Sequence, residues 1–218
     1  MHNTSLVSAS DAHQPTPAHQ AILPWLGMLR QLYPPSALML VGAGCDGSPW
    51  VQYLLATGHR NVTLIEADEA AAKRLKLATQ GQPDWNVEPH VIGRHSEATA
   101  FYTASLQTES GLLEPEALRS LWPNLKTIHK QTRQTVTLAK LLESAETPAN
   151  WLLLDCLPAL PIIQGAASQL AGIDVIAVRV VLNAQALPDS GASAEELQPA
   201  LQALGFRCLA IETSRHPA

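Results

Sequence analysis

Three glycines with a GxGxxG spacing are the strongest chemical signal in the sequence. Gly42, Gly44 and Gly47 follow the apolar run 37–41 and precede a segment, 50–56, with helical spacing of its apolar residues. Glycine permits a tight turn and close approach of a ligand to the backbone, and free N–H groups at a helix start favour a negative group. The pattern predicts a nucleoside-cofactor site; the alternative is a β/α turn whose glycines serve packing alone.

An acidic residue stands where such a site needs one. Glu66 lies nineteen residues after Gly47, at the end of the next predicted strand. A carboxylate at that tip can accept the hydrogens of both ribose hydroxyls. Dinucleotides and S-adenosylmethionine are both bound in this way, so the glycine pattern alone leaves the two cofactor classes open.

Composition limits the other function classes. The 218 residues are 46% hydrophobic and 15% charged, which fits one compact domain. A net charge of −5 disfavours binding to nucleic acid or to an anionic membrane. No run of about 18 apolar residues and no signal-peptide pattern occurs, so we expect a cytoplasmic protein. The three cysteines and eight histidines show no ligand spacing, so we expect reduced thiols and no metal site.

The elements that must position these residues alternate between strand and helix. Residues 1–20 are predicted to be a mobile leader, and 21–218 one domain that begins with a helix over 21–33. Strands are predicted at 37–41, 62–66, 87–92, 99–103, 135–138, 151–154, 174–182 and 206–212. Helices are predicted at 50–56, 69–79 and 194–204. This alternation predicts an α/β fold, with a mostly parallel sheet covered by helices on both faces.

The stretch 104–135 interrupts the alternation. It contains turn residues and one short helical segment, 116–121, so we expect it to cap one edge of the sheet or to line an acceptor pocket. The basic cluster 126–133 is interpreted as a solvated face.

The order of the motifs resembles the FkbM family of S-adenosylmethionine-dependent methyltransferases. The corresponding stretches are LVGAGCDG, IEADEAAAKRL, HVIGRHSEATAFY, VTLAKLLE, WLLLDCLPALPIIQGA and LQALGF, within 37–212. The resemblance implies a Rossmann-like class I methyltransferase fold, S-adenosylmethionine as cofactor, and O-methylation of a small-molecule or saccharide hydroxyl. The cofactor-binding candidates are Gly42, Ala43, Gly44, Gly47, Glu66 and Ala67. Asp155, at the tip of the strand 151–154, is the candidate catalytic residue, with a helix cap as the alternative.

The chain departs from the family pattern at several positions. Leu40 replaces an acidic residue before the glycines, and Leu157, Pro158 and Leu160 replace acidic and glycine residues after Asp155. These losses favour a second hypothesis, a catalytically inactive methyltransferase-like module that binds or regulates a partner. A nicotinamide-dependent oxidoreductase is a third.

Four further residues near these motifs carry weaker hypotheses. Arg179 stands where the family often has Glu, and beside a sulfonium it would need a carboxylate partner, either Asp155 or Glu212. His90 and His95 can act as a general base, although surface roles are commoner. Asp46 is interpreted as a helix cap, and Cys45 as a residue able to touch the cofactor.

Overall fold

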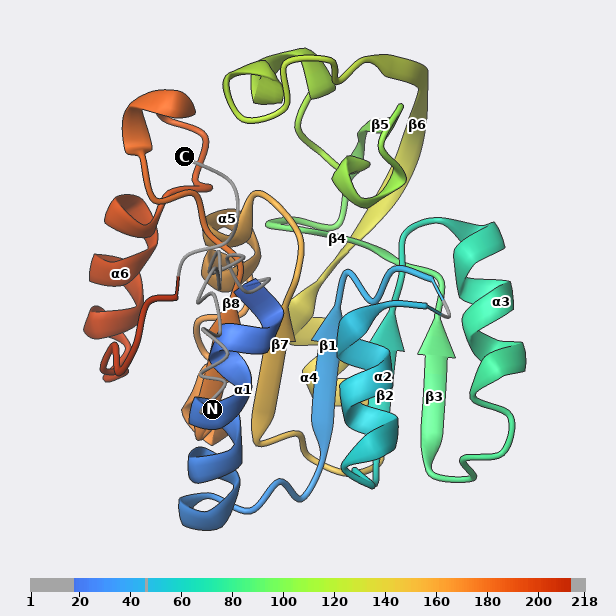
Figure 1. The fold of residues 1–218 in the computed structure, drawn as a ribbon, viewed down its shortest axis with the longest axis vertical. Coiled ribbons are helices and arrows are strands. Elements are labelled where there is room, and N and C mark those ends of the chain that lie inside the picture. Colours follow the sequence, from blue (N-terminus) through green and yellow to red (C-terminus); the bar gives the residue numbers. More distant parts are fainter. Residues whose placement is uncertain (1–17, 46, 213–218) are drawn as a thin grey trace, which may run out of the picture.

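The computed structural model describes residues 18–45 and 47–212 as an α/β fold (Figure 1). Its α-helices are α1 (Ala18–Leu32), α2 (Pro49–Ala56), α3 (Glu69–Ala78), α4 (Leu138–Ser144), α5 (Ala159–Gln164) and α6 (Ala194–Ala203). Its strands are β1 (Leu38–Val41), β2 (Val62–Ile65), β3 (Trp85–Glu88), β4 (Val91–Gly93), β5 (Ala98–Ala104), β6 (Thr127–Thr137), β7 (Trp151–Leu154) and β8 (Val175–Val178). Short 3₁₀ helices are η1 (Gln107–Glu109), η2 (Pro115–Ser120), η3 (Leu170–Gly172) and η4 (Ala184–Ala186).

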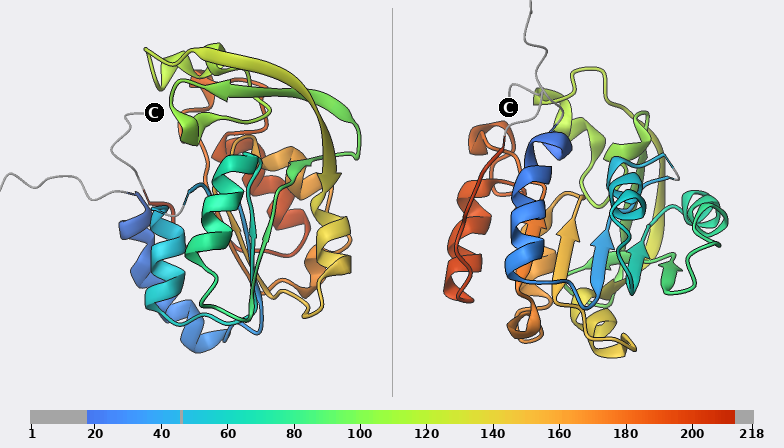
Figure 2. Two further views of the ribbon diagram at one scale, coloured as in Figure 1. Left: turned by 90° about the vertical axis from the view of Figure 1, so that its right-hand side faces the viewer. Right: turned by 60° about the horizontal axis from the view of Figure 1, so that its bottom comes forward.

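In the described part of the chain, five parallel strands form the central sheet in the order β3-β2-β1-β7-β8. Strands β1 and β7, with the sequences LMLV and WLLL, are buried at every position. Apolar side chains on both faces of a strand require cover on both sides of the sheet. Figure 2 shows that cover: α1, α2 and α3 lie on one face, and α4, α5 and α6 on the other.

The strand order reverses next to β1. The chain runs from β1 through β2 to β3 in one direction, and then returns to the other side of β1 to form β7 and β8. Between β1 and β7, loops from the two halves therefore leave the carboxyl edge in opposite directions. Such a switch point is where open parallel sheets bind ligands.

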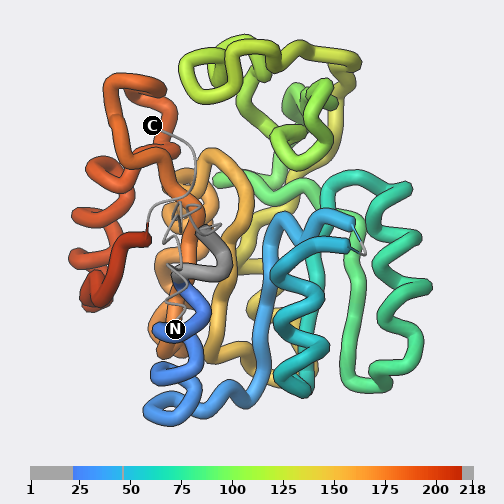
Figure 3. The backbone as a smooth tube through the Cα atoms, viewed as in Figure 1, coloured from blue at the N-terminus to red at the C-terminus, as the bar shows by residue number. Residues whose placement is uncertain are grey.

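A second sheet stands over the carboxyl ends of the first. It has three strands in the order β4-β6-β5, and with η1 and η2 it forms the green and yellow part of the tube in Figure 3. A small apolar cluster joins this insert to the segment after β8, and it includes Leu118, Leu121, Val181 and Leu187. The stretch 104–135 thus caps the carboxyl edge of the sheet, and its basic cluster lies on the partly exposed strand β6.

The predicted α/β class is confirmed, and four of the predicted elements need correction. The run 87–92 is split into β3 and β4, because Pro89 has no N–H to donate to a ladder. The strand predicted at 135–138 is the end of the longer β6, and Leu138 already begins α4. The strand predicted over 174–182 is limited to β8, and 206–212 is irregular because no described strand pairs with it.

Only the predicted boundary between the leader and the domain can be compared with the described residues. Helix α1 begins at Ala18, inside the predicted leader 1–20, and the rest of that leader lies outside the described residues. Among the residues that the structure describes, no helix is long and apolar enough to span a bilayer. The described cysteines are free thiols, and the described chain has no group of three or more potential metal ligands.

Candidate functional site

The glycine loop leaves β1 in a conformation that needs glycine. Gly42 and Gly44 have φ angles of +78° and +73°, in the left-handed region that side chains disfavour. A Cβ on Gly42 would stand 2.6 Å from the backbone carbonyl oxygen of Asp155. Gly42 therefore lets the ends of β1 and β7 touch at the switch point. By contrast, a Cβ on Gly47 would meet no atom within 4 Å, so no packing in the described structure requires this glycine.

Glu66 braces the loop. Its Oε2 accepts the N–H of Gly44 at 2.6 Å, and its Oε1 accepts the N–H of Asp68 at 2.8 Å. Burial raises the pKa of the Glu66 carboxyl, and these two N–H donors partly offset that rise. Each oxygen keeps a further lone pair, so the brace and a bound diol are compatible. The sequence pattern indicated the acid and its place but not this bond to the loop.

Helix α2 has one N–H donor fewer at its start than most helices. Ser48 is its N-cap, without a side-chain cap bond, and Pro49 at the first helical turn has no N–H. The N–H of Gly44, which the sequence pattern assigns to a negative group, is taken by Glu66. The predicted cap Asp46 lies outside the described residues, while Cys45 is exposed in the loop.

Arg179 joins the capping insert to the tip of β7. Its Nη2 lies 2.6 Å from Oε2 of Glu109, whose side chain is 6% exposed, and its Nη1 lies 4.0 Å from Oδ1 of Asp155. Its guanidinium also stacks over the ring of Trp122, 5.5 Å from the centroid. Of the two predicted partners for Arg179, Asp155 is near it, whereas Glu212 accepts the indole N–H of Trp25. The sequence missed Glu109 and Trp122 because neither lies in a recognisable motif.

A half-buried cysteine, Cys156, follows Asp155 in this arrangement. Burial raises the pKa of Cys156 to about 12, and the charges of Asp155, Arg179 and Glu66 also act on it. Cys156 is thus a neutral thiol at physiological pH. The three charged groups follow β2, β7 and β8, which end at the same edge of the parallel sheet.

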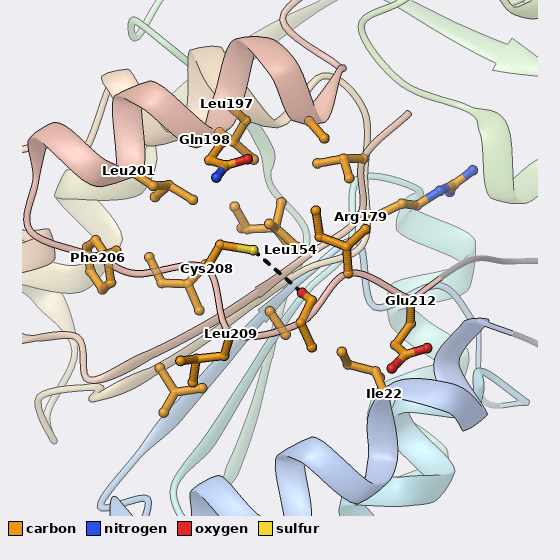
Figure 4. A pocket seen from close by; sticks show the side chains of 18 of the residues that line it. Ile22, Leu154, Arg179, Leu197, Gln198, Leu201, Phe206, Cys208, Leu209 and Glu212 are labelled. Carbon is orange, nitrogen blue, oxygen red and sulfur yellow. Dashed lines mark hydrogen bonds between the residues drawn. The ribbon is translucent and has the colours of Figure 1, made fainter. Parts of the chain in front are cut away.

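A large cavity opens beside these tips. It has a volume of about 1050 Å³ and runs along β8 between α1 and α6 (Figure 4). Asp155, Arg179 and Trp122 line one end of it. The six predicted cofactor residues do not line this cavity. They lie in the two neighbouring loops that follow β1 and β2. The structure therefore gives the carboxyl edge two parts, a glycine turn and an adjoining apolar cavity.

Comparison with known proteins adds no relative. No protein-family model, curated protein or solved structure matches this chain. The family resemblance therefore stays a prediction from motif order, and the function must be argued from the site.

The two histidines of the sequence prediction lie outside this arrangement. Nε2 of His90 is 3.5 Å from a carboxylate oxygen of Glu88, and the side chain is 39% exposed. His95 is exposed, and its backbone carbonyl accepts the hydroxyl of Thr135. Neither lines the large cavity, so neither enters the candidate site.

Proposed function

We propose that the carboxyl edge between β1, β2 and β7 binds S-adenosylmethionine, and that the protein is a Rossmann-like methyltransferase of small-molecule or saccharide hydroxyls. One observation carries the proposal: a glycine turn with two left-handed residues, braced by Glu66, stands beside Asp155 at the switch point of a parallel sheet. A nucleoside with a cationic end requires three features of a site. These are a backbone left accessible by glycine, an acid at the tip of the second strand, and a further carboxylate across the site.

The charge of the site favours a sulfonium over a pyrophosphate. Glu66 and Asp155 place two carboxylates at the edge, and the nearby cation, Arg179, is paired with Glu109. Pro49 removes one N–H from the helix start where a pyrophosphate would bind. The pyrophosphate of a dinucleotide would therefore meet negative charge, whereas the cationic cofactor would meet complementary charge. Cytoplasmic location accords with this proposal, because free thiols persist there.

The residues of the chain hold and orient the reactants. S-adenosylmethionine, when bound, supplies a methyl group already activated by its sulfonium, so the protein contributes mainly alignment. Glu66 offers to the ribose diol the carboxylate lone pairs that its backbone hydrogen bonds leave unused. Asp155 orients the amine of the cofactor or the hydroxyl of the acceptor, and Nη1 of Arg179 lies 4.0 Å from that carboxylate.

Calorimetric titration of the purified chain with S-adenosylmethionine, S-adenosylhomocysteine and NAD tests the proposal. We expect both adenosyl ligands to bind, and NAD not to. Gly47→Ala is the sharpest variant, because its methyl group would enter only the open space beside the loop. Gly81→Ala is the matched control, since a Cβ there also meets nothing within 4 Å. We expect about a ten-fold loss of affinity for the first and none for the second.

Three results would count against the proposal in different ways. If neither S-adenosylmethionine nor S-adenosylhomocysteine binds, the proposed cofactor site is refuted. Binding of NAD alone assigns the site to an oxidoreductase. Binding of S-adenosylmethionine without methyl transfer to any acceptor in a saccharide and natural-product panel supports the inactive module, which the pairing of Asp155 with Arg179 favours.

A further inference from the structure

The outer edge of β8 carries backbone groups that no described strand covers. Val175 and Arg179 donate their N–H groups toward β7, to the carbonyls of Asn150 and Leu154. Along a parallel strand, alternate residues direct their N–H and C=O groups to opposite sides. Ile176 and Val178 therefore present theirs to the outside, where the sheet ends within the described chain. An edge of this kind is a template for another strand.

The cavity of about 1050 Å³ lies along this edge, and its walls fit an extended peptide. The residues of β8 form one side of the cavity, and the irregular segment Phe206–Glu212 forms the other. Helix α1 contributes the partly exposed Ile22 to one face, and α6 contributes the partly exposed Leu201 to the opposite face. A strand placed here would meet an apolar wall with both of its alternating sets of side chains.

The outer wall of the cavity is itself an unpaired apolar segment. Leu209 and Ile211 line the cavity but remain 58% and 52% exposed. The segment is held in place by Phe206, which packs on the core next to α6, and by Glu212, bonded to Trp25. The cavity therefore lies between β8 and a wall that is anchored at both of its ends. The opposite edge of the sheet, β3, is different: its residues Asn86 and Glu88 make it a polar edge.

Charge distinguishes the two ends of the cavity. In Figure 4, Phe206 lies at one end, and Glu212 lies with Arg179 at the other. Asp155 lies 4.0 Å from Arg179 and so lines that second end, where the carboxylates of Asp155 and Glu212 outnumber the one cation. Arg207, next to Phe206, and Asp174 also line the cavity. Between the ends, the walls from α1, β8 and α6 are mostly apolar. An occupant complementary to this cavity is apolar in its middle and basic at one end.

We propose that this cavity is a docking site for a partner protein, which adds an extended apolar segment to the edge of β8 and places a Lys or Arg beside Glu212. The backbone of the segment pairs with Ile176 and Val178, and its side chains fill the two apolar walls. This interaction shares Asp155 and Arg179 with the proposed cofactor site, whose glycine loop and Glu66 lie outside the cavity.

Fluorescence polarisation with labelled seven-residue peptides tests the proposal on the full chain. The probes are acetylated TVIVTVK and KTVIVTV, which place the lysine at opposite ends and so cover both strand directions. We expect one of them to bind. Its analogue with Glu in place of Lys, and its analogue with N-methyl groups on the edge-facing amides, should each bind about ten-fold more weakly. Equal affinity of the methylated peptide, or no binding of either lysine probe, overturns the proposal.

Two protein variants and one exchange measurement complete the test. Glu212→Gln keeps an acceptor for Trp25 and should weaken the lysine probe about three-fold, whereas Glu146→Gln, at an exposed site elsewhere, should not change it. Hydrogen exchange should show the amides of Ile176 and Val178 becoming protected when the probe binds. If they are already as protected as β7 in the chain alone, or become so only as the chain dimerises, the chain itself covers the edge and the proposal fails.

Discussion

Gly42→Ala tests whether the ends of β1 and β7 are in contact. Gly58→Ala is the matched variant, because Gly58 also has a positive φ, +64°, but open space around its Cβ position. Both substitutions incur the left-handed penalty of about 1–2 kcal/mol. At Gly42 alone, the new methyl group also lies 2.6 Å from the carbonyl oxygen of Asp155 and 2.9 Å from its carbonyl carbon.

That contact cannot be relieved by a rotamer change, because the atoms belong to the backbone. Asp155 must move, and its N–H bond to the carbonyl of Val41, 2.8 Å long, is then strained or lost. Overpacking of this kind costs about 1–3 kcal/mol, and the hydrogen bond about 1 kcal/mol more. We therefore expect a free energy of unfolding lower by about 3–6 kcal/mol for Gly42→Ala and by about 1–2 kcal/mol for Gly58→Ala.

Urea unfolding followed by tryptophan fluorescence measures both differences, provided that the slopes with denaturant agree. Gly44→Ala adds a third point, since its Cβ would stand 3.6 Å from Ser48, an ordinary contact distance, and it should behave like Gly58→Ala. If Gly42→Ala and Gly58→Ala differ by less than about 0.5 kcal/mol, the strand ends are not in contact and the geometry of the switch point is wrong.

Three further predictions concern titratable groups with little or partial exposure, and a fourth concerns the hydrogen bonds from Glu66 to the loop. Burial lowers the pKa of His59 to about 4, so as the pH falls the unfolded chain takes up a proton on this imidazole before the folded chain does. The free energy of unfolding should therefore fall by at most about 3 kcal/mol between pH 6.5 and pH 4. The variant His59→Gln should not show this loss. Iodoacetamide at pH 8 should alkylate Cys156 about 1000-fold more slowly than the two exposed cysteines, as peptide mapping would show; equal rates would place the thiol in solvent. Arg179→Met should lower the unfolding free energy by about 3 kcal/mol and Glu109→Gln in that background should restore part of it, unless the pair is solvated. Glu66→Gln should cost about 2 kcal/mol in the same urea assay, because an amide nitrogen cannot accept the second N–H; unchanged stability would show that the brace is absent.

Elements bounded by strong local signals could be predicted from the sequence. The bounds of β7 agree with the expected strand 151–154, because a fully apolar run between Asn150 and Asp155 has few alternatives to a buried strand. The helix α3 agrees with the predicted 69–79 to within a residue, since Asp68 caps it with a bond to the N–H of Ala71.

Pairings between distant segments could not be predicted in this way. The apolar alternation of 206–212 resembles a strand, but a strand exists only with a hydrogen-bonding neighbour, and the cavity separates this segment from β8. The ion pair of Glu109 with Arg179 joins residues 70 positions apart. No sequence motif around either residue predicts the other, because the two come together only when the chain folds.

The position of Glu66 illustrates how a correct residue can be assigned an incomplete role. Spacing from the glycines locates an acid at the tip of β2, and ribose binding follows by chemistry. The fold adds a second demand, because the loop that starts at Gly42 turns its Gly44 N–H toward that same tip. A carboxylate has enough lone pairs to meet both demands, whereas a hydroxyl or an amide does not. Selection for either role alone would therefore retain an acid at this position, so the presence of Glu66 does not by itself distinguish a cofactor site from a structural bond to the loop.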